Sequence, residues 1–509
     1  MINLDKPLFQ FSDAPDDAWR VRDALEGVQI FGGIGSGKTS GSGKKLAKAF
    51  LKNGFGGLVH CAKPEEKDTW IQYAKETGRL DDVMIFEEGS DFYFNPLEYE
   101  NMREGKGGGE IFNLSNLFME IYKLGNRFTG GGGSEKDRYW DNALKRSLNR
   151  MILLLKTSGQ ELSIANMIAI MESIPSEEVV DAIPDYSEED WNKLYESSFC
   201  AQCLMDLYGV LTEKREQLEN IIEKEDKLID DEIIVATLEQ EIEALEEYYN
   251  VTYSYFFNHF AKADDKTKSI VRESFLGLAE PFTMGVLKKH FAGGITIKPE
   301  WSWEGKIIIL NFSVKEYLDS GLYAQGIFKY LWQQAIERRD TDKYPLPCFL
   351  WVDESQYFVN EYDTTFQTTA RSSRAATVFI TQNISNYYAQ MGGEASKAKV
   401  NSLLGNLSTK VFHANNDAVT NEWASNVIGK GVVNLKSEGE NRKNFHFLAD
   451  TKSTTLTPHI LPQILPLTFT MLRSGGPAND FDVEAVFVVK GRRWANGLNY
   501  MMAVFNQKD

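Results

Sequence analysis

The stretch Gly32-Gly-Ile-Gly-Ser-Gly-Lys-Thr39 matches the pattern G-x-x-x-x-G-K-[ST] at every fixed position. An apolar run, Val28–Phe31, comes directly before it and favours a short buried β-strand. After it, Lys44–Lys52 has its apolar residues at a spacing that places them on one helical face. Strand, glycine-rich turn and helix in this order are the context that the motif needs, so the sequence predicts a P-loop at the carboxyl end of a β-strand.

This P-loop predicts a nucleotide site, because glycines leave backbone N–H groups free to wrap phosphates and the following helix adds its dipole. Lys38 would place its charge against the β- and γ-phosphates, and Thr39 would offer its hydroxyl to Mg²⁺. We therefore predict that ATP and Mg²⁺ are bound by Gly32, Gly33, Gly35, Ser36, Gly37, Lys38 and Thr39. The adjacent Gly41-Ser-Gly-Lys44 lacks the spacing of a second P-loop, and we expect its glycines to allow close helix packing.

A second acidic site follows another apolar run, Cys348–Val352, which reads as a buried strand ending in Asp353 and Glu354. Phosphoryl transfer needs one residue to hold the metal and one to orient the attacking water. We assign Asp353 to Mg²⁺, through water, and Glu354 to the activation of water. A strand that happens to end in acidic residues is the alternative, and the upstream P-loop argues against it.

Three further polar residues flank the next predicted strand, Thr377–Ile380. Gln382, at the end of the strand Thr377–Ile380, is placed to hydrogen-bond the γ-phosphate or the attacking water. Either Arg371 or Arg374 fits an arginine finger that reaches a neighbouring subunit's nucleotide. A solvated arginine on a helix is the open alternative for each of them.

Short apolar runs with β-branched or aromatic content recur before and after the middle of the chain, and they predict strands at 57–61, 83–86, 306–310, 410–413 and 483–489. Apolar residues between Trp140 and Leu155 instead form a helical stripe. The pattern predicts an α/β motor with a mainly parallel sheet, interrupted by a helical insertion. We expect the first part of the ATPase domain at 1–97, the helical insertion domain at 98–295 and the second part of the ATPase domain at 296–509.

The charge of the chain is concentrated in one segment. The net charge is −18, but residues 171–250 alone carry 24 acidic and 5 basic residues, and the remainder carries a net charge of +1. An acidic segment repels phosphate backbones, so we do not expect it to bind DNA. A solvated helical hairpin and a docking face for a basic protein both fit this segment.

Within this segment, residues 211–249 predict two helices broken near Asp230-Asp231 and folded as an antiparallel hairpin. Cys200 and Cys203 form a lone C-x-x-C without a second ligand pair, and buried helix positions are favoured over a zinc site. Two glycine-rich stretches, 105–109 and 130–133, are expected to be flexible.

Composition points to a cytoplasmic protein. Four cysteines in 509 residues do not form a disulfide framework and fit a reduced compartment. The N-terminus has no basic region followed by an apolar run, and the longest apolar stretches are far shorter than the ~20 residues of a spanning helix. We therefore expect no signal peptide and no membrane anchor in this sequence.

Beyond the P-loop and Asp353-Glu354, four segments carry a resemblance to a known family. They are Phe94-Asn-Pro-Leu97, Tyr139-Trp-Asp-Asn-Ala143, the pair Arg371-Ser-Ser-Arg374 and Thr381-Gln-Asn383, and the stretch from Asn401-Ser-Leu-Leu-Gly-Asn406 through Lys410 and Asn416-Asp417 to Gly429. From residue 28 to about 475, the chain resembles the type IV coupling proteins of conjugation and type IV secretion, the TraG/TraD-like group. These proteins belong to the FtsK/HerA branch of RecA-like motors.

The resemblance implies a ring-shaped homo-hexamer that moves single-stranded DNA, with its attached relaxase, toward a membrane secretion channel. It implies that the helical insertion recognises cargo, such as a relaxase or accessory DNA-binding protein. It also implies a finger arginine about eleven residues before the sensor glutamine, which selects Arg371 over Arg374, and it implies that Lys410 approaches the nucleotide. Family members usually begin with transmembrane helices, whereas about 27 residues precede the first motor strand here. The resemblance thus implies a cytoplasmic protein, held peripherally at the inner membrane by channel components.

Two other functions fit the same motifs. One is a cargo receptor that delivers protein substrates and uses ATP as a conformational switch. The other is a soluble HerA-like motor in DNA processing, packaging or defence. A DNA-translocating motor of either kind predicts an ATPase stimulated by DNA, whereas the cargo receptor does not.

Overall fold

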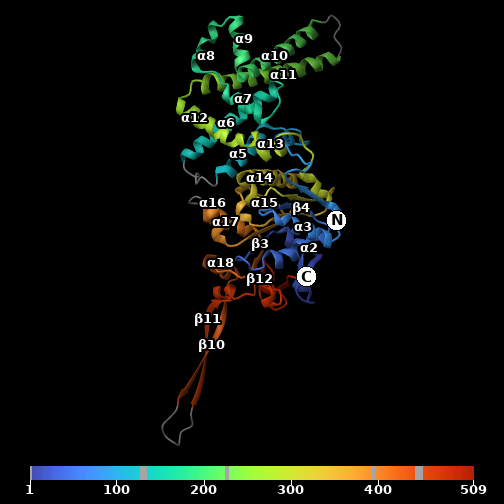
Figure 1. Cartoon of the computed structure of the whole chain (residues 1–509), viewed down its shortest axis with the longest axis vertical. Coiled ribbons are helices and arrows are strands. Elements are labelled where there is room, and N and C mark those ends of the chain that lie inside the picture. The colour runs from blue at the N-terminus through green and yellow to red at the C-terminus, as the bar shows by residue number, and fades with distance from the viewer. Residues whose placement is uncertain (1–2, 127–134, 224–228, 392–395, 442–450) are drawn as a thin grey trace. The chain divides into compact units, whose positions relative to one another are not determined.

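The computed structural model describes residues 3–126, 135–223, 229–391, 396–441 and 451–509 (Figure 1). The glycine-rich stretch 130–133 lies outside these residues. The chain forms two compact units. The first comprises Met1–Ile85, Glu300–Asn311 and Trp332–Asp509, and the second comprises Phe86–Pro299 and Phe312–Leu331. The expected domain boundaries at residues 97 and 295 stay a prediction.

A nine-stranded sheet, in the order β13-β12-β9-β3-β8-β7-β4-β6-β5, organises the motor fold. Its strands are β3 (Val28–Phe31), β4 (Gly56–His60), β5 (Val83–Phe86), β6 (Ile307–Leu310), β7 (Cys348–Val352), β8 (Ala375–Thr381), β9 (Thr409–Phe412), β12 (Asp482–Val489) and β13 (Tyr500–Asn506). The run from β9 through β3, β8, β7 and β4 to β6 is parallel, and β12 pairs antiparallel with β9 and β13. The predicted α/β fold with a mainly parallel sheet is confirmed.

Helices pack on both faces of this sheet. The elements outside the sheet are β1 (Pro7–Gln10), β2 (Ala18–Arg20), α1 (Val21–Leu25), α2 (Lys44–Lys52), α3 (Glu65–Glu76), α15 (Glu361–Thr369), α16 (Ile384–Met391), α17 (Ser396–Asn406) and α18 (Ala418–Ile428). On one face, Trp70 of α3 stacks on Phe349 of β7, with ring centroids 5.4 Å apart. On the other, Trp423 of α18 meets Phe31 of β3 edge to face, at 5.8 Å. Two apolar layers therefore bury the strands, which explains their continuous hydrophobic runs.

Helix α2 has the bounds that its apolar spacing predicts. Its residues Leu46, Ala47, Phe50 and Leu51 are all buried in the core of the sheet. The preceding glycines allow the close packing that we expected of them, since a Cβ at Gly41 would meet Val483 Cγ1 at 3.0 Å. Any larger residue at Gly41 would push this helix away from β12.

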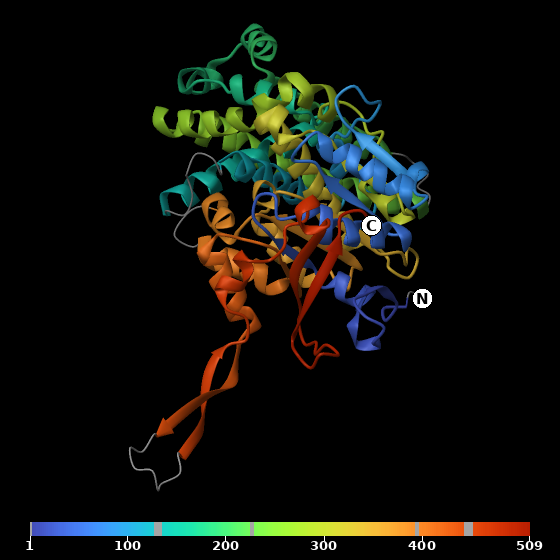
Figure 2. The same ribbon diagram turned by 60° about the horizontal axis from the view of Figure 1, so that its bottom comes forward.

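A long hairpin, β10 (Lys430–Asn441) and β11 (Thr451–Pro462), was not predicted from the sequence. Its two strands pair only with each other among the described residues, and Figures 1 and 2 show it projecting from the region of α18 and β12. Side chains such as Val432 and Ile460 are exposed. None of its described side chains, at 430–434, 437 and 454–462, is buried, and its sequence lacks the alternation of polar and apolar residues by which a half-buried strand is recognised.

The second unit is helical over the stretch that we expected to be an insertion. Its elements are α4 (Pro96–Asn101), α5 (Ile111–Asn126), α6 (Glu135–Thr157), α7 (Ile164–Glu172), α8 (Glu177–Ala182), α9 (Glu188–Ser197), α10 (Phe199–Ile222), α11 (Ile229–Tyr253), α12 (Asp265–Ala279) and α13 (Gly285–Phe291), and α14 (Val314–Arg338) begins within it. The predicted stripe on α6 is buried at Leu148, Met151 and Ile152. Over the residues that the structure describes, no helix combines the length and apolar character needed to cross a membrane.

The acidic helices α10 and α11 form the antiparallel hairpin that the sequence predicts. Lys214 pairs with Glu241 at 2.7 Å and Arg215 pairs with Glu246 at 2.6 Å, from one helix to the other. The break was predicted near Asp230-Asp231, and the structure places it slightly earlier, since α10 ends at Ile222 and α11 begins at Ile229.

Candidate functional site

The P-loop connects β3 to a π-helical turn, Thr39–Gly43, that leads into α2. The backbone of Gly37 has φ 78°, a conformation that other residues rarely adopt. A Cβ there would meet Val483 Cγ2 at 2.5 Å, and one at Gly32 would meet Ser36 Oγ at 2.4 Å. Only glycine fits these two positions, so the loop presents bare backbone N–H groups where phosphates would bind.

The remaining residues of the loop support the same shape. The N–H of Gly33 donates to the carbonyl of Ala414 at 2.8 Å, which ties the loop to the end of β9. Gly35 also has a positive φ, of 70°. Ser36 is buried, and within the described parts of the chain its Oγ has no hydrogen-bond partner. A buried hydroxyl without a partner inside a glycine cradle fits a site built for a polar ligand.

The two sequence motifs meet through one hydrogen bond. The hydroxyl of Thr39 donates to Asp353 Oδ2 at 2.8 Å, across 314 positions of sequence. Asp353 is 5% exposed, and its Oδ1 accepts the N–H of Glu354 at 2.8 Å. Burial raises the pKa of Asp353, while the nearby charge of Lys38 acts to lower it. A hydroxyl and a carboxylate oxygen at this distance are the hard ligands that Mg²⁺ prefers.

Glu354 lies in a left-handed backbone conformation, with φ 44° and ψ 45°, directly after β7. Its Oε1 lies 3.1 Å from Lys63 Nζ, and its Oε2 accepts from Gln356 Nε2 at 3.0 Å. Burial on its own would raise the pKa of Glu354, but the Gln356 hydrogen bond and the charges of Lys38 and Lys63 together lower it. The carboxylate is therefore held ionised, as a residue that accepts a proton from water must be.

Gln382 reaches the same carboxylate from the end of β8. Its Nε2 donates to Glu354 Oε2 at 3.4 Å, and its backbone carbonyl accepts from Asn415 Nδ2 at 2.8 Å. The ends of β3, β7 and β8 thus bring Lys38, Asp353 and Gln382 to one edge of the sheet. This is the carboxyl edge, where ligands bind in open α/β sheets.

Arg371 lies at the opposite edge. It precedes β8, and its Nη1 pairs with Glu26 Oε1 at 3.0 Å, just before β3 begins. Its side chain is 63% exposed, so it remains accessible to a neighbouring molecule. The nearby Arg374 instead donates to the carbonyls of Thr341 and Pro345, which closes a turn within the chain. Arg371 is thus the more exposed of the two candidates, and its role as an arginine finger stays a prediction.

Lys410 is not brought to the P-loop. In the sheet, Lys410 of β9 lies beside Gln29 of β3. Its Nζ donates to the carbonyl of Leu407, toward the edge at which β9 begins. Burial lowers the pKa of Lys410 to about 8, with a smaller contribution from Lys490. Within one chain Lys410 points away from the carboxyl edge, and its approach to a nucleotide stays a prediction.

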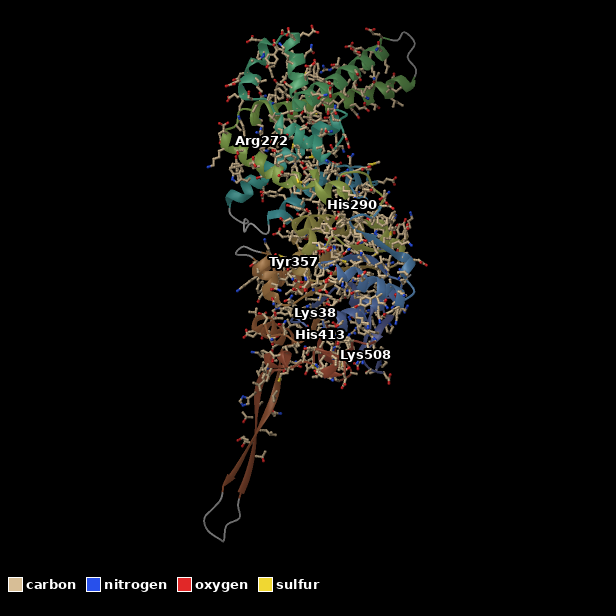
Figure 3. The ribbon with its side chains drawn as sticks, viewed as in Figure 1. Lys38, Arg272, His290, Tyr357, His413 and Lys508 are labelled. Atoms are coloured by element: carbon tan, nitrogen blue, oxygen red, sulfur yellow. The ribbon has the colours of Figure 1, made fainter. Side chains whose placement is uncertain are left out.

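Several polar residues of the site were missed by the sequence reasoning. Lys63 and Gln356 hold Glu354, and His413 holds the P-loop helix, close to Lys38 (Figure 3). His413 Nδ1 donates to the carbonyl of Glu484 at 3.2 Å, so its Nε2 accepts from the Ser42 hydroxyl at 2.7 Å. Burial lowers the pKa of His413 to about 3, so the ring stays neutral. Lys63 and His413 could have been found because each follows a strand of the same parallel sheet.

The lone C-x-x-C has the structural role that we favoured. Cys200 and Cys203 are both buried in α10. Burial raises the pKa of both thiols, that of Cys203 to about 12. They are therefore kept as neutral, apolar packing groups.

Comparisons with known proteins find similarity both in one segment of the chain and in the fold. Residues 347–464, which include Asp353, Glu354 and Gln382, match the family described as the TraM recognition site of TraD and TraG. No curated protein sequence matches the chain.

Solved structures of the plasmid coupling protein TrwB have the same fold over nearly the whole chain. An unbound form of the bacterial conjugative coupling protein TrwBdeltaN70 is 11% identical with a TM-score of 0.56, covering 98% of this chain and 89% of that one. TrwB in complex with ADP and Mg²⁺ is 10% identical with a TM-score of 0.53 and the same coverage. TrwB with the GTP analogue GDPNP is 11% identical with a TM-score of 0.52, covering 97% and 89%. Residues 347–464 therefore resemble the TraM recognition segment of TraD and TraG, and the chain as a whole has the fold of the coupling protein TrwB.

Proposed function

We propose that this protein is an ATP-driven coupling ATPase that moves DNA, with a bound relaxase or accessory protein, toward a conjugation or type IV secretion channel. The hydrogen bond between Thr39 and Asp353, with Glu354 beside it, carries the ATPase part of this proposal. Transport is supported by the family, whose structurally characterised member TrwB is a conjugative coupling protein. In this role the protein would act as a homo-hexamer at the cytoplasmic face of the inner membrane, recruited there by channel components.

Each residue of the carboxyl edge has a distinct task in this proposal. Lys38 and the P-loop backbone would bind and neutralise the phosphates of ATP, and Thr39 and Asp353 would hold Mg²⁺. An Mg²⁺ held by these two residues would supply positive charge that stabilises the negative charge developing on the phosphates. Glu354 would orient the attacking water and accept its proton, and Gln382 would link that carboxylate to the γ-phosphate.

The function is tested by measuring ATPase rates without DNA and with single- or double-stranded DNA at equal nucleotide concentration. We expect single-stranded DNA to stimulate ATP turnover, because a DNA motor hydrolyses ATP fastest while it is bound to DNA. Stimulation should weaken as salt rises, since contacts to phosphates release counterions. Turnover that is unchanged by either kind of DNA over a range of salt would exclude a DNA motor.

An arginine finger supplied by a neighbour makes turnover depend on assembly. We expect specific ATPase activity to rise with protein concentration, and Arg371→Ala to reduce kcat by about 10³-fold or more while nucleotide affinity is kept. Rate is measured against concentration, and affinity by titration with a fluorescent ATP analogue. Arg374→Ala is an informative comparison, because its turn contacts predict reduced thermal stability instead. An active Arg371→Ala protein with a concentration-independent rate would contradict the hexamer.

The acidic hairpin of α10 and α11 is proposed as the docking face for a basic partner. Four exposed glutamates can be changed to glutamine without touching the cross-helix ion pairs: Glu216, Glu219, Glu239 and Glu243. We expect the quadruple variant to keep its basal ATPase rate and to bind a relaxase or accessory protein more weakly, because attraction between opposite charges is lost. Wild-type binding should also fall with salt, which screens charges over about 8 Å at physiological ionic strength. Equal binding by variant and wild type, with equal salt dependence, would assign the charges to solubility alone.

A further inference from the structure

Glu354 is held from two sides, by groups of different mobility. The sheet order β3-β8-β7-β4 places the end of β7, where Glu354 lies, between the P-loop side and the β4 side. From the P-loop side, Gln382 donates to Oε2 at 3.4 Å. From the β4 side, Lys63 approaches Oε1 at 3.1 Å. The stronger, charge-assisted contact therefore draws the carboxylate away from the P-loop.

The two carboxylate oxygens differ in how firmly they are bound. Oε2 belongs to a buried network, because Gln356 donates to it at 3.0 Å and in turn accepts from the Thr381 hydroxyl at 2.6 Å. Oε1 is paired with a lysine whose side chain is 36% exposed, whereas the Glu354 side chain is 7% exposed. A partly exposed lysine on a flexible stem can leave this position, but the buried Gln356 cannot. The Lys63 contact is thus the one that can be broken without unfolding the site.

The turn that carries Lys63 is itself fixed. The N–H of Ala62 donates to Glu66 Oε2 at 2.8 Å, and the N–H of Glu66 donates to the carbonyl of Lys63 at 3.2 Å. Lys63 follows β4 and is not part of either nucleotide motif. Its backbone is held in place, so only the side chain needs to move to release Glu354.

We propose that Lys63 is a positioning residue that holds Glu354 back from the attacking water, and that breaking this ion pair is a step required for rapid turnover. The proposal rests on the role of Glu354 as the residue that activates water. In the resting chain Oε1 shares its lone pairs with the Lys63 ammonium, which leaves it a poor acceptor for a proton from water. Release of Lys63 lets the carboxylate turn toward the P-loop while Gln356 keeps its other oxygen in place.

The test compares Lys63→Met, which keeps the length of the side chain and removes its charge, with Lys63→Arg. At one fixed protein concentration without DNA, we expect Lys63→Met to raise kcat by about tenfold, or about 1.4 kcal/mol, with KM for ATP unchanged. Lys63→Arg should have the slow kcat of the wild type, because arginine keeps a positive charge beside Glu354. Lys75→Met, at an exposed position of α3, is the matched control and should behave as wild type. DNA should stimulate Lys63→Met less than wild type, since the restraint is already gone.

If Lys63 has only a structural role, Lys63→Met should not raise the basal kcat. If Lys63→Met melts at the wild-type temperature and its basal kcat is unchanged or lower, the restraint does not exist. Lys63→Gln replaces the methionine variant if the latter does not fold, and the same criteria apply to it. The double variant Lys63→Met with Glu354→Gln should lose the gain, and a gain that persists would overturn the proposal. If Glu354→Gln alone is active, Glu354 is not the base, and the proposed mechanism of hydrolysis fails. If Glu354→Gln is inactive and Lys63→Met is no faster than wild type, only the proposed role of Lys63 fails.

Discussion

Lys38→Ala should reduce ATP turnover by at least about a hundredfold, because it removes the cation that we assign to the β- and γ-phosphates. The structure places the charge of Lys38 next to both Asp353 and Glu354, so its loss would also leave two carboxylates facing the phosphates. We therefore expect weaker ATP binding as well as slower hydrolysis. Turnover is measured by phosphate release, and affinity by titration with a fluorescent ATP analogue.

A matched control separates loss of a specific contact from loss of positive charge. Lys45→Ala changes an exposed lysine in the first turn of α2, outside the P-loop. We expect it to retain wild-type turnover. If Lys38→Ala hydrolyses ATP at a rate similar to that of Lys45→Ala, the assignment of the nucleotide site is wrong.

Glu354→Gln should have a comparably large effect on turnover and a different effect on binding. Glutamine keeps the size of the side chain but cannot accept a proton, so we expect kcat to fall by about 10²- to 10⁴-fold. ATP and Mg²⁺ should still bind, because Lys38, Thr39 and Asp353 are unchanged. The expected product is a stable ATP-bound protein, detected by the retention of labelled ATP after gel filtration.

Asp353→Asn offers the informative comparison for this variant. It removes the negative charge of a residue that we assign to Mg²⁺ binding. ATP binding by this variant should therefore depend less on the Mg²⁺ concentration. Glu354→Gln should keep the metal dependence of wild type. Hydrolysis by Glu354→Gln at the wild-type rate would show that another residue activates the water.

The motor strands and α2 were predictable because their patterns are local. Continuous apolar runs mark strands that are buried on both faces, and the spacing of Leu46, Ala47, Phe50 and Leu51 marks one face of a helix. The link between Thr39 and Asp353 could be expected from motif chemistry alone, since both groups bind the same metal. Its hydrogen bond joins residues 314 positions apart, so the sequence could suggest this contact but not its geometry.

Other features depend on contacts that no local pattern contains. The hairpin of β10 and β11 has exposed side chains such as Val432 and Ile460, and among the described residues its two strands pair only with each other. Lys410 lies in a segment that resembles a known family in sequence, but its side chain donates to the carbonyl of Leu407, a contact that no sequence pattern contains. The role of Lys63 depends on β4 and β7 being neighbours, which is a property of strand order.

The pairing of β4 has a consequence for how the protein is made. β4 is flanked by β6 and β7, both of which lie beyond the helical stretch in sequence. During synthesis, His60 of β4 cannot pair until its partner Val352 of β7 has been made. At roughly 5–20 residues per second, the delay between the synthesis of the two residues is about 15–60 s. Over that time the nascent chain exposes two unpaired strand edges next to apolar runs, a state that is prone to aggregation. The high contact order of this sheet thus favours a chain that depends on chaperones while the ribosome completes it.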